Sequence, residues 1–360
     1  MHILIALLGG ALVALMLFEI FLAFLLPRRV KRDPLLARRV AIYAFGPWRA
    51  LARRLPDQMG DTLLGMYGPF GLLLDLGLWV VLLMFGYACL LWGGGSHLSG
   101  AGSVDFGQDL YYSAATLVSA STGGLEAQNS FTRIVEVVEA ATGFGVLTIV
   151  IAYLPSLYQA FSRRETTVSQ LDARAGSPPS AGRLVVRATQ HGGWPALNRY
   201  LRGWEGWSAE LMETHLSYPT LAFFRSQHVN QNWLSALCTI LDASALAVSA
   251  APPGSVEEAR FTFAISRHCV ADLCYTFRVH PAAESVDRLP TADFDALIGE
   301  LRENGVELRA EPQIIREQLE RMRALYEPYA EVLAERVELH LPPWLAPESP
   351  TDNWRTTEWH

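Results

Sequence analysis

Three long apolar runs dominate the first half of the chain. They cover residues 3–26, 63–92 and 133–161. At 1.5 Å per residue a helix of this length crosses about 30 Å of hydrocarbon. The first run contains one acidic residue, Glu19, and the second contains one, Asp75. We therefore predict three transmembrane helices.

The polar residues between these runs indicate the orientation. Nine Lys and Arg residues lie between Arg28 and Arg54, with Asp33 as the one acid, and the third run ends in the basic pair Arg163-Arg164. Basic residues next to a span favour the cytoplasmic side. We expect a multi-pass protein of the cell inner (plasma) membrane with its N-terminus outside and its C-terminal part in the cytoplasm. The basic linker is expected to lie on the lipid bilayer.

The second half reads as a mostly helical cytosolic domain. Apolar residues there recur at three- and four-residue spacing, which is typical of helices packed on a core. The expected helices cover 196–218, 220–249, 256–279, 291–304 and 312–341. The expected domains are an N-terminal span with its linker (1–62), a central module (63–165), a polar linker (166–189) and the cytosolic domain (190–360).

Composition narrows the function classes. Hydrophobic residues make up 51% of the chain, and the net charge of −7 does not favour a nucleic acid as partner. No strand-GxGxxG-helix unit is present. His215, His228, His268 and Cys269 have no HExxH or CxxC spacing, so neither a metal site nor catalytic residues are expected, and the protein is not expected to be an enzyme.

The stretch 109–126 lies between the second and third runs. It is too polar and too short to cross the membrane twice. Irregular backbone at membrane depth is tolerated only where it is buried in protein or faces water. We therefore predict a short re-entrant helix followed by a turn, the arrangement that lines a pore.

This region resembles the pore module of the two-transmembrane potassium channel family. In that family a helix of the LYFSxxTL type leads into the filter TVGYGD, and an inner helix with an early Glu and a Gly hinge follows. The residues in register are Leu110-Tyr111-Tyr112-Ser113, Thr116-Leu117, Gly123, Glu136, Glu139, Gly143 and Gly145. The resemblance, together with the first span, implies a bacterial member with an extra N-terminal helix, a homotetramer, and monovalent cations, K⁺ or Na⁺, as permeant ions without a bound cofactor.

The resemblance places the filter in the turn after the short helix. Two of the residues that are usual in that filter are replaced here. The pore and filter positions would be Thr116, Ser119, Ala120, Ser121, Thr122, Gly123 and Gly124. Ser121 stands where the family has a glycine, and Thr122 where it has a bracing aromatic. A potassium filter replaces the ion's hydration shell with backbone carbonyls. These two changes favour a wider, hydrated constriction with altered selectivity, and strain at Ser121 is expected.

Acidic and helix-bending residues complete the candidate site. Asp105, Asp109 and Glu126 are expected around the outer mouth. Glu136 and Glu139, one helical turn apart, either add to this negative charge or brace the pore loop from behind. Gly143, Gly145 and Pro155 are candidates for a gating hinge. Close packing between helices is the alternative explanation of the two glycines.

The sequence thus predicts an all-α membrane protein with three transmembrane helices and a re-entrant pore helix. The expected function is that of a potassium-channel-like cation channel. Two other classes stay open. One is a non-conducting, channel-like scaffold or sensor, and the other is a membrane-tethered enzyme whose site lies in the cytosolic domain.

Overall fold

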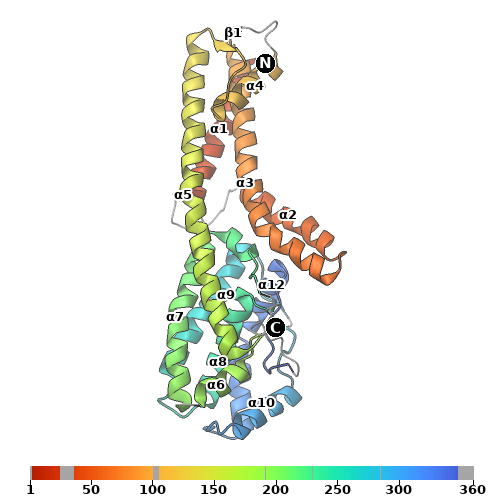
Figure 1. The fold of residues 1–360 in the computed structure, drawn as a ribbon, viewed down its shortest axis with the longest axis vertical. Helices are drawn as coiled ribbons and strands as arrows, with labels where there is room; N and C mark the ends of the chain where they lie inside the picture. The colour runs from red at the N-terminus through yellow and green to blue at the C-terminus, as the bar shows by residue number, and fades with distance from the viewer. Residues whose placement is uncertain are drawn as a thin grey trace, which may run out of the picture. The chain divides into compact units, whose positions relative to one another are not determined.

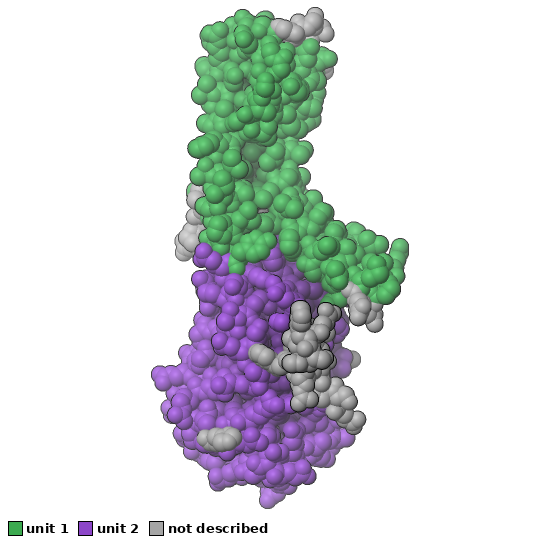
Figure 2. Space-filling model, in the orientation of Figure 1, with its two compact units in different colours: residues 1–158 green, residues 159–360 purple. Residues whose placement is uncertain are grey.

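The computed structural model describes residues 2–24, 36–99, 105–190, 192–228, 230–283 and 285–347. The regular secondary structure of the described residues is helical except for two strands of two residues each. It divides into two compact units, residues 1–158 and 159–360, which are coloured separately in Figure 2. Each unit is described by itself below.

Unit 1 is built from long helices joined by short connections (Figure 1). Strands β1 and β2 pair antiparallel, with Leu98 opposite Ala127. The last helix, α5, is the longest, and its residues from Gln159 onward belong to unit 2. The elements are α1 (His2–Phe24), α2 (Leu36–Ala52), α3 (Asp57–Gly94), β1 (Leu98–Ser99), α4 (Phe106–Leu117), β2 (Glu126–Ala127) and α5 (Ser130–Ala175).

Four described helices are long and apolar enough to cross a membrane, namely α1, α3, α5 and α8 (Trp233–Ala250). Protein covers only 28% of the apolar window of α1, 33% of that of α3 and 11% of that of α5. The window of α8 is entirely covered, so this helix is the core of a folded unit. Helices α1, α3 and α5 are therefore those of a multi-pass membrane protein.

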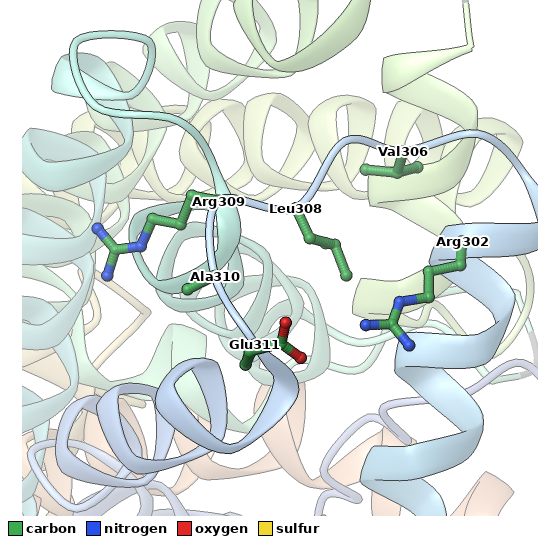
Figure 3. A pocket seen from close by; sticks show the side chains of 6 residues that line it. All are labelled: Arg302, Val306, Leu308, Arg309, Ala310 and Glu311. Carbon is green, nitrogen blue, oxygen red and sulfur yellow. The ribbon is translucent and has the colours of Figure 1, made fainter.

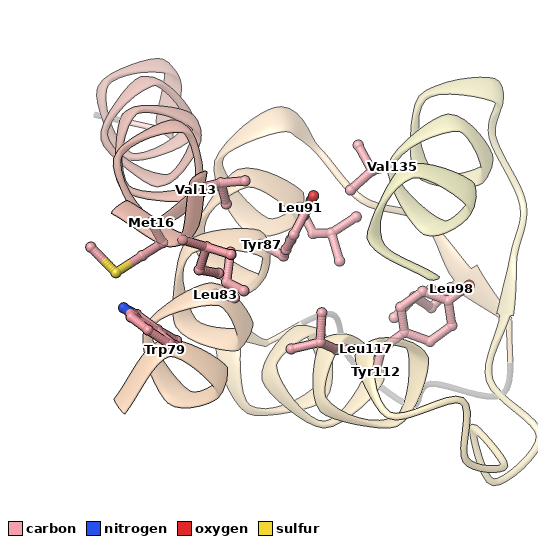
Figure 4. Close-up of a cluster of buried hydrophobic side chains, with 11 residues drawn as sticks. Val13, Met16, Trp79, Leu83, Tyr87, Leu91, Leu98, Tyr112, Leu117 and Val135 are labelled. Atoms are coloured by element: carbon pink, nitrogen blue, oxygen red, sulfur yellow. The ribbon is translucent and has the colours of Figure 1, made fainter. Parts of the chain in front are cut away.

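Close packing of α1 on α3 organises unit 1. A side chain at Gly9 would overlap the backbone of Gly86 and Leu90, so the two helices touch backbone to backbone there. Small residues permit such an approach between apolar helices. A cluster of buried side chains continues this contact and is drawn in Figure 4; it includes Val13, Met16, Trp79, Leu83, Tyr87, Leu91, Tyr112 and Val135.

Unit 2 differs from the expectation in three places. The polar stretch 166–189 is helical, because α5 continues through it to Ala175 and α6 follows. The helix expected from residue 220 begins only at Trp233, where the Asn232 side chain accepts a hydrogen bond from the Ser235 amide at 2.6 Å. The elements are α6 (Ala181–Thr189), α7 (Gly193–Ser217), the 3₁₀ helix η1 (Pro219–Phe223), α8, α9 (Glu257–Phe277), α10 (Thr291–Glu303), α11 (Pro312–Arg323) and α12 (Glu327–Val337).

The third difference is a break in the expected helix 312–341. α11 ends at Arg323 and α12 begins at Glu327, which places Pro328 in the first turn of the new helix. Proline lacks an amide proton and obstructs the preceding turn inside a helix, but it fits the first turn. The break therefore avoids placing Pro328 inside a continuous helix. The apolar periodicity alone did not show this conflict.

A buried ion network joins α8 to the C-terminal part of unit 2. Asp242 on α8 is fully buried and accepts bonds of 2.7 and 3.1 Å from Arg288 and one from the Tyr326 hydroxyl. Glu327 is 2.9 Å from Arg288 and 3.0 Å from Arg323. A charge inside an apolar helix is tolerated here because partners within the same unit neutralise it.

A second buried cation, Arg164 on α5, holds η1 in place. Its guanidinium donates to the carbonyls of Leu221 at 2.8 Å and Phe224 at 2.7 Å. It also lies 3.2 Å from Nε2 of His215 on α7. Because a guanidinium can only donate, this ring nitrogen must accept, and Nδ1 carries the proton and donates to the Leu211 carbonyl at 2.8 Å.

Burial and the nearby Arg164 guanidinium lower the pKa of His215 well below its usual range. The unfolded chain therefore binds a proton near pH 6.5 that the folded unit excludes. We expect the free energy of unfolding to fall by about 1.4 kcal/mol per pH unit below about pH 6.5 from this residue alone. His215→Gln removes this acid sensitivity, as measured by denaturant unfolding of the full-length protein in detergent at a series of pH values.

His268→Gln provides the matched control, because His268 is exposed on α9. It should leave the slope below pH 6.5 unchanged. An equal slope in wild type and His215→Gln would contradict the assignment.

Candidate functional site

Helix α4 is the short helix on which the candidate site is built. The Asp105 side chain caps its start by accepting a hydrogen bond from the Gln108 amide at 2.9 Å. One face of α4 is buried and carries Asp109, Tyr112, Ser113, Thr116 and Leu117. Figure 4 shows Tyr112 and Leu117 pointing into the apolar cluster of unit 1.

Asp109 ties the start of α4 to the end of α3. It is fully buried, and its carboxylate accepts a 2.7 Å hydrogen bond from the Ser96 hydroxyl. This acid is expected at the outer mouth, but its carboxylate is buried and holds α4 instead. Glu126, the acid of β2, is exposed and fits a lining position instead.

Glu139 joins α5 to the back of α4. Its side chain is fully buried, and Oε1 lies 2.5 Å from the Ser113 hydroxyl. Three residues further on, the Thr142 hydroxyl is bonded to the Tyr87 hydroxyl of α3 at 2.8 Å. Glu136, one turn before Glu139, is partly exposed. The two glutamates are therefore placed differently, with Glu139 as the bracing residue.

The end of α4 is closed by a hydrogen-bonding motif centred on Ser119. The Ala120 amide donates to the Ala115 carbonyl at 2.7 Å, and the Ser119 amide donates to the Thr116 carbonyl at 3.1 Å. This pair of bonds defines a Schellman motif, in which the residue after the cap is left-handed. Ser119 has φ of 56°, a conformation in which glycine is preferred.

The irregular segment 118–125 follows this motif. Its residues are exposed, except Thr122 and Leu125, which are half-buried. The Thr122 hydroxyl donates to the Leu125 carbonyl at 2.8 Å. Positive φ angles occur at Ser119, Gly123 and Gly124 but not at Ser121. The backbone strain expected at Ser121 is therefore found at Ser119.

Ser119→Gly should stabilise unit 1. A left-handed conformation costs an L-residue about 1–2 kcal/mol, which glycine avoids, although glycine loses more chain entropy on folding. We expect a net gain of up to about 1 kcal/mol, measured as a higher thermal midpoint of the full-length protein in detergent.

Ser121→Gly is the control, because Ser121 gains no relief of strain and pays only the entropy of a more flexible chain. It should lower the midpoint or leave it unchanged. A stabilising Ser121→Gly with a neutral Ser119→Gly would show that the strain lies where the family alignment placed it.

The three hinge candidates on α5 occupy different environments. A Cβ at Gly143 would overlap the carbonyl oxygen of Leu117, so the end of α4 rests directly on this glycine. A Cβ at Gly145 would meet nothing within 4 Å. Pro155 lies inside α5, which is helical on both sides of it. Close packing accounts for Gly143, and the hinge stays a prediction for Gly145 and Pro155.

Gly143→Ala should push α4 away from α5. Overpacking of this kind costs about 1–3 kcal/mol, because neither backbone can move without breaking its own hydrogen bonds. The expected result is a lowered thermal midpoint in detergent. Gly145→Ala is the matched control on the same helix, and it should raise the midpoint slightly because alanine favours helix. Equal effects of the two substitutions would contradict the contact with Leu117.

An open pocket of about 520 Å³ lies in unit 2 beside α10 and the start of α11. Figure 3 shows the Arg302 and Glu311 side chains pointing toward one another across it, whereas Arg309 points away. Both Arg302 and Glu311 are exposed, so neither is held in place for a ligand. Across the described ranges, no group of three or more His, Cys, Asp or Glu side chains is arranged to hold a metal ion.

A scan against protein-family models, a search of curated proteins and a search of solved structures each found no match to this chain. The features of the chain that bear on function are α4, segment 118–125 and α5. Sequence reasoning missed two residues of this site, Ser96 and Tyr87. Their partners, Asp109 and Thr142, are distant in sequence, and no local pattern indicates such pairs.

Proposed function

We propose that the protein forms a pore for monovalent cations, in which segment 118–125 lines the narrow part. The observation that carries this proposal is the irregular backbone between α4 and α5, within a unit built from apolar, membrane-length helices. Exposed backbone of this kind is stable at membrane depth only beside water. α4 is then a re-entrant pore helix, and α1, α3 and α5 are the three spans, with the N-terminus outside and unit 2 in the cytoplasm.

The surface of α5 supports a pore-lining role. Of the three membrane-length helices of unit 1 it is the least covered, with 11% of its apolar window buried. One face carries small and hydroxyl-bearing residues at alternating four- and three-residue spacing: Ala141, Gly145, Thr148 and Ala152. Residues at this spacing share a helix face. A narrow, mildly polar face on an uncovered span suits contact with water and with neighbouring copies.

We infer a homotetramer, because the described part of unit 1 contributes one proposed pore-lining segment, 118–125, per chain. One segment cannot enclose a pore, whereas a fourfold ring of identical chains can, as the resemblance to two-transmembrane potassium channels implies. Four copies of the exposed Glu126 and Asp105 would make the entrance negative and attract cations. The hydroxyls of Ser119 and Ser121 would add polar ligands without a bracing aromatic. We infer a hydrated constriction that conducts K⁺ and Na⁺.

Purified protein in liposomes should conduct K⁺ and Na⁺ at comparable rates, because a hydrated constriction discriminates weakly between them. The double variant Ser121→Gly, Thr122→Tyr restores the two residue types that the family filter uses, and it should raise the ratio of K⁺ to Na⁺ flux. Ion flux for each cation, measured on the same preparation, checks both expectations.

Glu126→Gln tests the entrance charge separately and should lower cation flux without changing the ratio. An intact tetramer that passes no cation under any condition would reject the channel and favour the non-conducting scaffold or sensor. A conducting double variant with an unchanged flux ratio would show that segment 118–125 does not select the ion.

A further inference from the structure

The Ser113 hydroxyl has two close neighbours that are both acceptors in their usual states. Its Oγ lies 2.5 Å from Glu139 Oε1 and 2.8 Å from the carbonyl oxygen of Met84. The three residues belong to α5, α4 and α3, so the contacts join three helices. Ser113 and Glu139 are both fully buried. We refer to Glu139, Ser113 and the Met84 carbonyl as the carboxyl brace.

The number of hydrogens in the carboxyl brace decides its protonation. A serine hydroxyl has one hydrogen and can donate it once. If Glu139 were ionised, three oxygens would share that one hydrogen, and one of the two short contacts would be a repulsion between lone pairs. A backbone carbonyl has no hydrogen to give, so the missing hydrogen must come from the glutamate.

We propose that Glu139 is a neutral carboxylic acid in the folded protein, and that this neutral form positions the pore helix. Glu139 donates to Ser113, and Ser113 donates to the Met84 carbonyl. Both short contacts are then hydrogen bonds, and α4 is fixed to α3 and α5 at one point. Loss of the proton leaves one of the two contacts without a hydrogen.

The surroundings of Glu139 agree with a neutral side chain. The charged and titratable groups that interact with it are Tyr87 on α3, Tyr112 on α4 and Glu136 on its own helix. No described Lys, Arg or His forms an ion pair with it. Its second oxygen, Oε2, is buried without a hydrogen-bond partner. A buried carboxylate is costly unless it is paired, and a second carboxylate one turn away increases the cost.

A neighbouring copy in a tetramer cannot supply the missing partner. The unpartnered Oε2 is already out of reach of solvent within a single chain, so no side chain from outside can touch it. The state of Glu139 is therefore set by its own chain and does not depend on assembly.

Infrared difference spectroscopy of the full-length protein in detergent or lipid tests the proton directly. Wild type minus Glu139→Gln at neutral pH should show the carbonyl band of a protonated carboxylic acid. Ser113→Ala should shift this band, because the acid loses its hydrogen-bond partner. Glu136→Gln is the matched control one turn away and should leave the band in place. Absence of the band, or a band that Glu136→Gln removes, overturns the proposal.

The positioning role has a second, independent readout. Glutamine keeps a donor at this position and cannot ionise, so Glu139→Gln should fold and keep its thermal midpoint as the pH is raised. The wild-type midpoint should fall at alkaline pH by about 2–4 °C more than that of the variant, the size expected for one lost hydrogen bond. If the thermal midpoints of wild type and Glu139→Gln depend on pH in the same way, a proton on Glu139 does not stabilise the fold.

Ion flux provides a third measurement, which rests on the proposed pore function. Wild-type flux should decline at alkaline pH, and that of Glu139→Gln should not. Protein that shows the infrared band and conducts no ion would reject the pore while leaving the carboxyl brace established. Protein that conducts and lacks the band would reject the brace alone.

Discussion

The contact between the end of α4 and α5 is the constraint that sets where the irregular segment of unit 1 begins. Gly143 lets the Leu117 carbonyl approach the backbone of α5 with no side chain between them. α4 therefore ends at a fixed place, and the irregular segment 118–125 starts there. Asp109 fixes the other end of the same helix through Ser96. α4 has twelve residues and is held at both ends and along one face, so it has little freedom to tilt. This rigidity fixes the start of the irregular segment that follows it.

The buried acids Asp109, Glu139 and Asp242 have different kinds of partner in the two units. In unit 2 the buried acid Asp242 faces Arg288, and the network is close to neutral. Two buried acids of unit 1, Asp109 and Glu139, face serine hydroxyls instead. By composition α8 resembles a membrane span, yet its acid has a cation partner within a folded unit. At these three positions the partner of the buried carboxyl is a cation in unit 2 and a hydroxyl in unit 1.

The apolar runs predicted the long helices of unit 1, because a continuous stretch of about twenty hydrophobic residues has few other structures open to it. The continuation of α5 to Ala175 was missed, although Val168, Leu171 and Ala175 are buried at helical spacing in an otherwise polar stretch. The left-handed residue was expected at Ser121 and lies at Ser119. That position depends on where α4 ends, and the end is set by Leu117 meeting Gly143, a tertiary contact that local propensity cannot reveal. The partners of Glu139 and Asp109 were beyond prediction for the same reason.

The short pair of strands β1 and β2 has a consequence for whatever occupies segment 118–125. It joins Leu98 to Ala127, so α4 and the segment form a loop whose ends are already together. The entropy of closing that loop is lost when the protein folds, not when a ligand arrives. In the proposed pore, an ion would need to order only the few residues that touch it, so its site would be preorganised. Such a loop would combine weak affinity for each ion and rapid exchange between ions with a well-defined path.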